Sequence, residues 1–163
     1  MVELQIKGGT DAIVAGGTTS EASTMPESEN MEVIKFIVEK VNGRIPVIAG
    51  TGSNDTKSCL EMSLEAKELG DDGLLIVTHD YNKTSQKGLV EHFNYIADNV
   101  KLPVILYNVP SRTALNITPQ TYKELSKNPY IVATKEANGD ISAIAETIAL
   151  CGDDLPVYSG EDS

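Results

Sequence analysis

The stretch PVILYNVPSRT, residues 103–113, joins a short apolar run to a group of polar and charged residues. The near-continuous hydrophobicity of Val104, Ile105 and Leu106 is typical of a strand that is buried on both faces of a parallel sheet. Tyr107 and Arg112 follow at the C-terminal end of this run, where parallel α/β proteins place their binding and catalytic groups. The stretch therefore predicts a parallel sheet with a functional site at one edge.

Five other short apolar runs have the same character. They are AIVAGG (12–17), IPVIAG (45–50), GLLIVTH (73–79), IVATKEA (131–137) and PVYSG (156–160). Segments with helical periodicity separate the runs, and three of them have start signals, namely Thr24 with Pro26, Thr118 with Pro119, and Asp140. The runs begin about 25 to 33 residues apart, which corresponds to one βα unit per period. The sequence predicts one parallel α/β domain over residues 1–163.

Two architectures share this pattern, a (β/α)8 barrel and an open doubly wound sheet. Polar residues follow nearly every run: Thr18, Thr19 and Glu21; Thr51, Ser53 and Asn54; Tyr81 and Asn82; Tyr107 and Arg112; Lys135 and Glu136. A barrel collects site residues from several successive strands, whereas a doubly wound sheet concentrates them at one switch point. A complete barrel has eight strands and about 250 residues. We therefore expect a partial TIM-type barrel with about six parallel strands, and keep a rearranged open doubly wound sheet as the alternative.

The composition narrows the classes of partner. Twenty-four acidic and 13 basic residues give a formal net charge of −11, which opposes binding to nucleic acid or to anionic lipid surfaces. Cys59 and Cys151 lack metal-ligand spacing, and no apolar run approaches the ~20 residues of a membrane span. We expect a cytoplasmic protein without a metal or cofactor. A flavodoxin-like nucleotide binder ranks last because a glycine-rich phosphate loop is missing.

Six blocks of the sequence together resemble one family, the dihydrodipicolinate synthase (4-hydroxy-tetrahydrodipicolinate synthase) family. They are GTTSEAST (17–24), GRIPVIAGTGSN (43–54), YNKTSQKGLVEHF (81–93), ILYNVPSRT (105–113), KEANGDIS (135–142) and YSGED (158–162). The resemblance implies a (β/α)8 lyase of the pyruvate-dependent aldolase superfamily, related to N-acetylneuraminate lyase. Such a lyase condenses pyruvate with aspartate semialdehyde in lysine biosynthesis. The first strand, the eighth strand and the C-terminal helices of the family have no counterpart in this chain.

The resemblance assigns Lys135 as the lysine that forms a Schiff base with pyruvate. Such a lysine needs a neutral fraction at pH 7, which burial promotes by disfavouring the ammonium ion. By itself, a lysine at a strand end is more often a solvated charge. Tyr107 resembles the phenol of the proton relay, a role that suits a group able to donate and accept. The alternative for Tyr107 is a tyrosine that anchors a loop.

The resemblance places Thr18 and Tyr81 in the same relay, with Tyr81 reaching in from a neighbouring subunit. It also implies that Thr19 helps to hold the carboxylate of pyruvate. Both threonines would equally suit turns or helix caps. Arg112 would bind the second acidic substrate, because a guanidinium pairs with a carboxylate through two parallel hydrogen bonds. A salt bridge to a loop carboxylate is the alternative for Arg112.

Four positions depart from the family pattern. Ser20 replaces a glycine, and a positive φ there would strain the turn. His79 and Asp80 stand where the family has Pro-Tyr, which affects how Tyr81 is presented to a neighbouring subunit. His79 is read as an ordinary polar residue at a strand end, and Thr134 replaces an apolar residue.

Two hypotheses therefore stay open. The chain is either a pyruvate-binding Schiff-base lyase whose missing strands another chain supplies, or a catalytically impaired partial barrel that folds and self-associates without turnover. The retained site residues favour the lyase. Both hypotheses predict a homo-oligomer that covers the exposed edges of the sheet.

Overall fold

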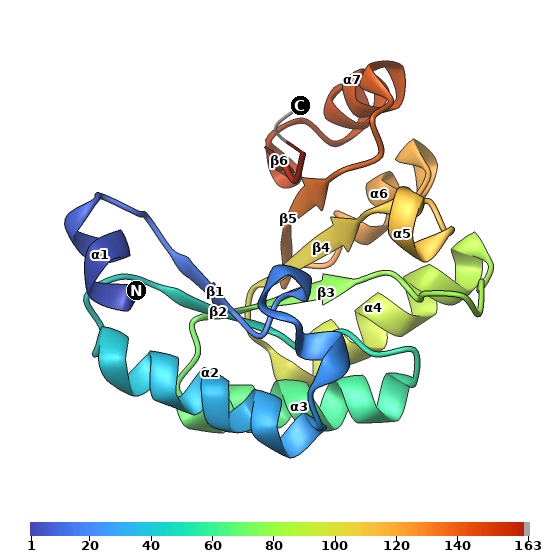
Figure 1. The fold of residues 1–163 in the computed structure, drawn as a ribbon. Helices are drawn as coiled ribbons and strands as arrows, with labels where there is room; N and C mark the ends of the chain where they lie inside the picture. Colours follow the sequence, from blue (N-terminus) through green and yellow to red (C-terminus); the bar gives the residue numbers. More distant parts are fainter. Residues whose placement is uncertain (162–163) are drawn as a thin grey trace.

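The structure, a computed structural model, describes residues 1–161, and Asp162 of the YSGED block lies outside them. Six strands form one sheet in the order β1-β2-β3-β4-β5-β6, and every neighbouring pair is parallel (Figure 1). The strands are β1 (Ile13–Ala15), β2 (Val47–Gly50), β3 (Gly73–Val77), β4 (Val104–Asn108), β5 (Ile131–Glu136) and β6 (Val157–Ser159). Each lies within one of the six apolar runs, so the predicted strands are confirmed.

Helices fill the segments between the strands. They are α1 (Val2–Lys7), α2 (Glu27–Val41), α3 (Thr56–Leu69), α4 (Gln86–Val100), α5 (Pro110–Thr113), α6 (Pro119–Leu125) and α7 (Ile141–Cys151). Short 3-10 turns occur at Thr18–Ser20, Ala22–Thr24 and Gly152–Asp154. None of the helices in the described part of the chain is long and apolar enough to cross a membrane.

Two of the predicted helix starts hold, and one differs. Thr118 accepts a hydrogen bond from Thr121 N at the start of α6, and Asp140 accepts from Ser142 N and Ala143 N at the start of α7. At α2, by contrast, the N-cap is Pro26, without a side-chain cap. The Thr24 hydroxyl there donates backwards to Glu21 O and closes a 3-10 turn instead.

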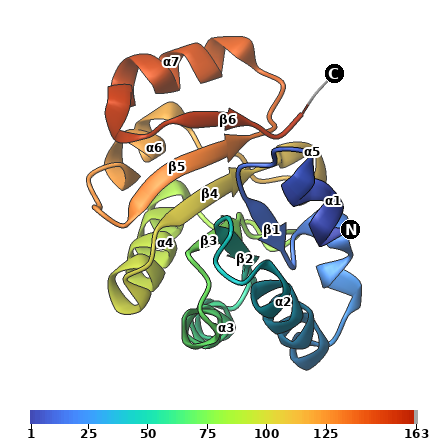
Figure 2. The same cartoon turned by 90° about the vertical axis from the view of Figure 1, so that its left-hand side faces the viewer.

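The sheet is curled, and the main helices lie along its convex side (Figure 2). A doubly wound sheet would reverse its strand order and carry helices on both faces. Neither feature occurs between β1 and β6, so the open-sheet alternative is wrong. The curl with sequential parallel strands is that of an incomplete (β/α)8 barrel.

The two faces of the sheet differ in how well they are covered. The convex face and the helices share one large apolar core, which includes Ile34, Leu74, Phe93 and Leu106. The concave face has a smaller buried cluster of Leu75, Tyr107 and Val109. Side chains alternate between the two faces of a strand. Those on the less covered concave face are the ones that could contact a substrate.

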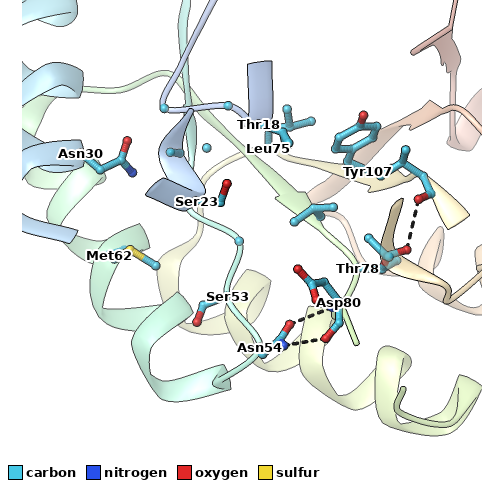
Figure 3. A pocket seen from close by; sticks show the side chains of 18 of the residues that line it. Thr18, Ser23, Asn30, Ser53, Asn54, Met62, Leu75, Thr78, Asp80 and Tyr107 are labelled. Carbon is cyan, nitrogen blue, oxygen red and sulfur yellow. Dashed lines mark hydrogen bonds between the residues drawn. The ribbon is translucent and has the colours of Figure 1, made fainter. Parts of the chain in front are cut away.

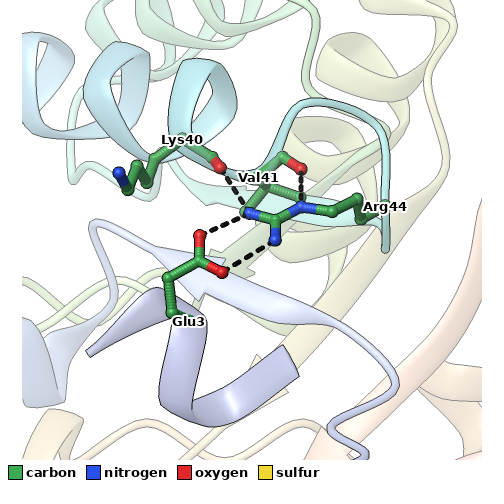
Figure 4. Close-up of polar contacts among 4 residues, drawn as sticks. All are labelled: Glu3, Lys40, Val41 and Arg44. Atoms are coloured by element: carbon green, nitrogen blue, oxygen red, sulfur yellow. Dashed lines mark hydrogen bonds and ion pairs between the residues drawn. The ribbon is translucent and has the colours of Figure 1, made fainter. Parts of the chain in front are cut away.

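Arg44 ties α1 to the C-terminal end of α2 (Figure 4). Its guanidinium donates two hydrogen bonds to the Glu3 carboxylate, at 2.8 and 2.7 Å, and others to Val41 O and Lys40 O. The hydrogen bond from Arg44 lowers the pKa of Glu3 to about 2. Bidentate geometry fixes the direction of α1.

Candidate active site

A hollow of about 370 Å³ opens at the C-terminal ends of β1 to β4. In the view of Figure 3, Thr18 and Leu75 lie near each other with Tyr107 to their right, Ser23 lies lower and to the left, and Asn54 with Asp80 lies at the bottom. Arg112 of α5 also lines the hollow. The strands of the curled sheet therefore bring residues from four βα units to one place, as a barrel predicts.

Tyr107 and Lys135, two of the predicted site residues, are in direct contact. They are register partners on β4 and β5, so both point to the concave face. Lys135 Nζ lies 4.2 Å from the centroid of the Tyr107 ring. Tyr107 is buried and Lys135 is half-buried. This arrangement puts an amine and a phenol side by side, as required for imine chemistry with proton transfer.

Burial is the main influence on the Tyr107 hydroxyl. It raises the pKa of Tyr107 above its usual value, and the nearby charge of Arg112 opposes this rise. The phenol therefore remains protonated near neutral pH, when it can donate a hydrogen bond or a proton.

The remaining predicted residues are less closely assembled. Thr18 lines the hollow from the 3-10 turn after β1, whereas Thr19 and Tyr81 do not line it. Tyr81 is 87% exposed and has a positive φ of 59°. Lys135 also lies outside the lining of the hollow, next to Tyr107 on its far side. One chain thus brings Thr18, Tyr107 and Arg112 to the hollow, places Lys135 against Tyr107 outside it, and leaves Tyr81 exposed to solvent.

The expected strain at Ser20 is absent. The residue with positive φ in this turn is Glu21, at 63°, and Ser20 lies in the 3-10 helix that precedes it. Ser20 Oγ donates to Gly17 O at 2.7 Å. The serine therefore stabilises the turn, and the concern based on its replacement of a glycine was wrong.

Glycines allow the ends of β1 and β2 to approach closely beside the hollow. A Cβ on Gly50 would lie 2.3 Å from Gly16 O, and Gly16 itself has a positive φ of 67°. Larger residues at these positions would separate the two strands.

The two substituted residues before Tyr81 occupy different environments. Asp80 lines the hollow, and its backbone exchanges two hydrogen bonds with the Asn54 side chain, at 2.7 and 2.8 Å. His79 is buried, with its ring 4.4 Å from the His92 ring. His79 therefore packs against His92 and does not line this hollow.

Asn30 and the role of Glu136 are not evident from the sequence. Asn30 lines the hollow from α2, is buried, and has no hydrogen-bond partner for Oδ1 among the described residues. It sits within a helical pattern that gives no signal of a site. Glu136 is buried beside Lys135 in a polar network that joins three elements. Within residues 1–161, no group of three His, Cys, Asp or Glu side chains is placed to hold a metal ion.

Comparisons with known proteins point to one family. The family model described as "Dihydrodipicolinate synthetase family" matches residues 1–163. The 4-hydroxy-tetrahydrodipicolinate synthase of Caldicellulosiruptor saccharolyticus is 57% identical over 162 residues, which make up 99% of this chain and 55% of the relative. That of Acetivibrio thermocellus is 56% identical, with the same coverage.

Solved structures agree with this match. Dihydrodipicolinate synthase from Aquifex aeolicus has a TM-score of 0.95 and 42% identity, covering 98% of this chain and 55% of that one. The chloride-inhibited enzyme from Acinetobacter baumannii, solved in complex with pyruvate, has a TM-score of 0.94 and 46% identity with the same coverage. The chain thus spans about half the length of the relatives that it matches.

Proposed function

The chain belongs to the dihydrodipicolinate synthetase family, and we propose that it provides the pyruvate-binding half of a Schiff-base lyase. The second substrate in this proposal is aspartate semialdehyde, a small acidic aldehyde. Relatives named as 4-hydroxy-tetrahydrodipicolinate synthases support the lyase over the catalytically impaired alternative.

The observation that supports the proposal most directly is the contact between Lys135 and Tyr107. An amine lies 4.2 Å from the centroid of a buried phenol ring, at the C-terminal ends of adjacent parallel strands. The contact keeps the amine of Lys135 against the phenol ring, whereas a fully solvated lysine at a strand end would extend away from the sheet.

In the proposed reaction, Lys135 Nζ attacks the carbonyl carbon of pyruvate. The carbonyl oxygen leaves as water, and a protonated imine remains. Loss of a proton from the pyruvate methyl group gives an enamine. Its carbon forms the new C–C bond to the aldehyde carbon, the aldehyde C=O double bond opens and its oxygen takes up a proton, and the protonated imine re-forms. Hydrolysis then releases the product and regenerates the amine. Tyr107 and Thr18 are proposed to move the protons, since both have hydroxyls at the hollow.

The carboxylates of the two substrates need donors. We assign Arg112, at the rim of the hollow, to the second acidic substrate, because its guanidinium can bind a carboxylate with two hydrogen bonds. Thr19 is assigned to pyruvate through its hydroxyl and backbone N–H. Tyr81 is exposed in one chain, so its proposed role in the relay requires a neighbouring copy. A homo-oligomer is therefore part of the proposal.

Reduction with borohydride tests the first step, because it converts an imine into a stable amine. Intact protein incubated with pyruvate and borohydride should gain one pyruvate-derived adduct, and peptide mapping should place it on Lys135. Lys135→Ala should lose the adduct and keep the fold. Lys83→Ala, which removes an exposed lysine of the β3–α4 loop, is the matched control and should keep it. Absence of an adduct on the unmodified sequence, or its survival in Lys135→Ala, would refute the assignment.

A further inference from the structure

A buried polar cluster lies directly behind the Lys135–Tyr107 pair. Successive side chains of a strand point to opposite faces. Tyr107 pairs with Lys135 in the register of β4 and β5, and the next residues, Asn108 and Glu136, pair with each other. The two site residues therefore face the concave side, while Asn108 and Glu136 meet on the side of the helices.

Glu136 is the centre of this cluster. Asn108 Nδ2 donates to its two carboxylate oxygens, at 2.9 and 3.1 Å. The Tyr122 hydroxyl, from α6, donates to Oε2 at 2.7 Å, and Asn138 N donates to Oε1 at 3.0 Å. Thr134 Oγ1 in turn donates to the Tyr122 hydroxyl at 3.1 Å. Each of the four side chains is at most 5% exposed.

The partners of Glu136 are all donors, so an ionised carboxylate satisfies them best. Burial raises the pKa of Glu136, and the hydrogen bonds from Tyr122 and Asn108 oppose that rise. Burial also raises the pKa of Tyr122, which keeps its hydroxyl a donor. None of the polar atoms in this cluster is among the buried atoms without partners in residues 1–161. A fully satisfied buried network is rigid.

The cluster also reaches the segment that follows Arg112. Asn108 Nδ2 donates to Asn116 Oδ1 at 2.7 Å, and Ile117 N donates to Asn108 Oδ1 at 3.1 Å. Gln86 of α4 donates to Asn116 O at 2.7 Å. The same hydrogen bonds thus join β4, β5, α6 and the loop after α5.

We propose that Glu136 is a positioning residue, whose buried carboxylate locks β4 to β5 and thereby holds Lys135 over Tyr107. The expected effect of Glu136 on the reaction rate rests on the proposed Schiff-base function. Its effect on the position of Lys135 does not depend on that function. Lys135 has a flexible stem of four carbons, so the position of Nζ depends on where β5 is held against β4. Misplacement by about 1 Å can cost about 100-fold in rate.

The kinetic test compares borohydride trapping of pyruvate in Glu136→Gln and in a control variant. Glu136→Gln keeps the shape but places an NH2 group among donors, and the maximal trapping rate should fall about 10- to 100-fold. The pyruvate concentration at half-maximal rate should change little, since Glu136 does not touch pyruvate. Glu146→Gln is the matched control, a surface carboxylate that accepts from Gln120 Nε2 at 2.7 Å, and should leave the rate unchanged.

A second measurement reads the geometry without any reaction. In protein with 13C-labelled lysine, the Lys135 ε-protons should be displaced upfield by the Tyr107 ring, with the signal assigned by its loss in Lys135→Ala. Glu136→Gln should abolish this displacement. An unchanged Lys135 signal and an unchanged maximal rate in folded Glu136→Gln would overturn the positioning role.

If the unmodified protein forms no adduct, the proposed function fails, and the lysine signal alone decides the inference. If Glu136→Gln does not fold, Tyr122→Phe gives the same two readings.

Discussion

Lys135 and Tyr107 are register partners on adjacent parallel strands, and Lys135 Nζ lies 4.2 Å from the centroid of the Tyr107 ring. In this contact, the Tyr107 side chain can contribute in two ways. The ring face attracts an ammonium ion and so holds the lysine, while the hydroxyl at the end of the ring can exchange protons. These two contributions can be separated by removing the hydroxyl alone.

Tyr107→Phe should keep Lys135 in place and slow the formation of the imine. Loss of a group that transfers protons in the transition state typically costs about 100-fold or more. The rate of pyruvate trapping by borohydride measures the effect, and the displaced lysine signal checks that the ring contact persists. Tyr95→Phe, at an exposed position on α4, is the control and should behave like the unmodified protein. A full trapping rate in Tyr107→Phe would exclude the phenol from the relay.

Gly160→Ala should displace Lys135 without unfolding the protein. A Cβ at this position would lie 2.9 Å from Lys135 Cε and 3.0 Å from Cγ. The lysine stem is flexible, so it moves aside, and the trapping rate should fall by about tenfold or more. Gly8→Ala, at the end of α1, is the control for a change of the same size. Equal trapping rates in the two variants would show that the stem of Lys135 has room to spare.

The six strands could be predicted because a parallel sheet covered by helices requires continuous apolar runs, such as Leu74 to Val77 of β3. The C-terminal position of Tyr107 and Lys135 followed from the same pattern. The Glu136 cluster could not be predicted, since Tyr122 and Asn108 are 14 and 28 residues away and meet Glu136 only through the pairing of β4 with β5 and the packing of α6.

The backbone conformation of the turn after β1 could not be predicted from the sequence either. A serine in place of a glycine suggested strain at Ser20, yet the chain places the left-handed residue one position later, at Glu21. Sequence gives the residue types of a turn and does not determine which residue takes positive φ. The packing of His79 against His92 was also not foreseen, because it depends on how two distant segments pack in the fold.

Asp71→Ala should stabilise the protein, increasingly so at high pH. Asp71 is buried, neither carboxylate oxygen has a partner among the described residues, and burial raises its pKa from 3.8 to about 7. Because the folded pKa is the higher one, the stability linked to the proton is complete below pH 3.8 and is lost as pH rises through about 7.

Urea unfolding at several pH values measures this effect. At pH 8, Asp71→Ala should gain about 2 to 3 kcal/mol in the free energy of unfolding, and near pH 4 much less. Asp11→Ala, which removes an exposed carboxylate, is the control and should show no such gain. A gain that is independent of pH would mean that the pKa of Asp71 is the same in the folded and the unfolded protein.

His79→Phe should make the protein less sensitive to mild acid. The chain has two histidines. Burial lowers the pKa of His92 to about 4, helped by the neighbouring His79, while Asp55 opposes this, and burial lowers that of His79. The folded state therefore keeps both rings neutral, and its stability falls as pH drops from 6.5 through about 4.

Phenylalanine keeps a ring against His92 without a proton to bind. Melting temperatures at pH 7 and pH 5 should differ less in the variant than in the unmodified protein. An equal loss in both proteins would place the acid sensitivity elsewhere.

The chain should self-associate at micromolar concentration. β1 and β6 are the outer strands of the sheet, and within the described residues neither has a strand on its outer edge. Val14 on β1 is 45% exposed and Tyr158 on β6 is 61% exposed. Apolar side chains beside unpaired backbone N–H and C=O groups favour association through the sheet edges.

Light scattering should therefore give a mass above that of one chain. Tyr158→Lys should shift the mass towards the monomer, because it places a charge on the β6 edge, whereas Tyr95→Lys on α4 should not. A monomer mass for the unmodified chain would rule out association through these edges, and with it the delivery of Tyr81 by a second copy.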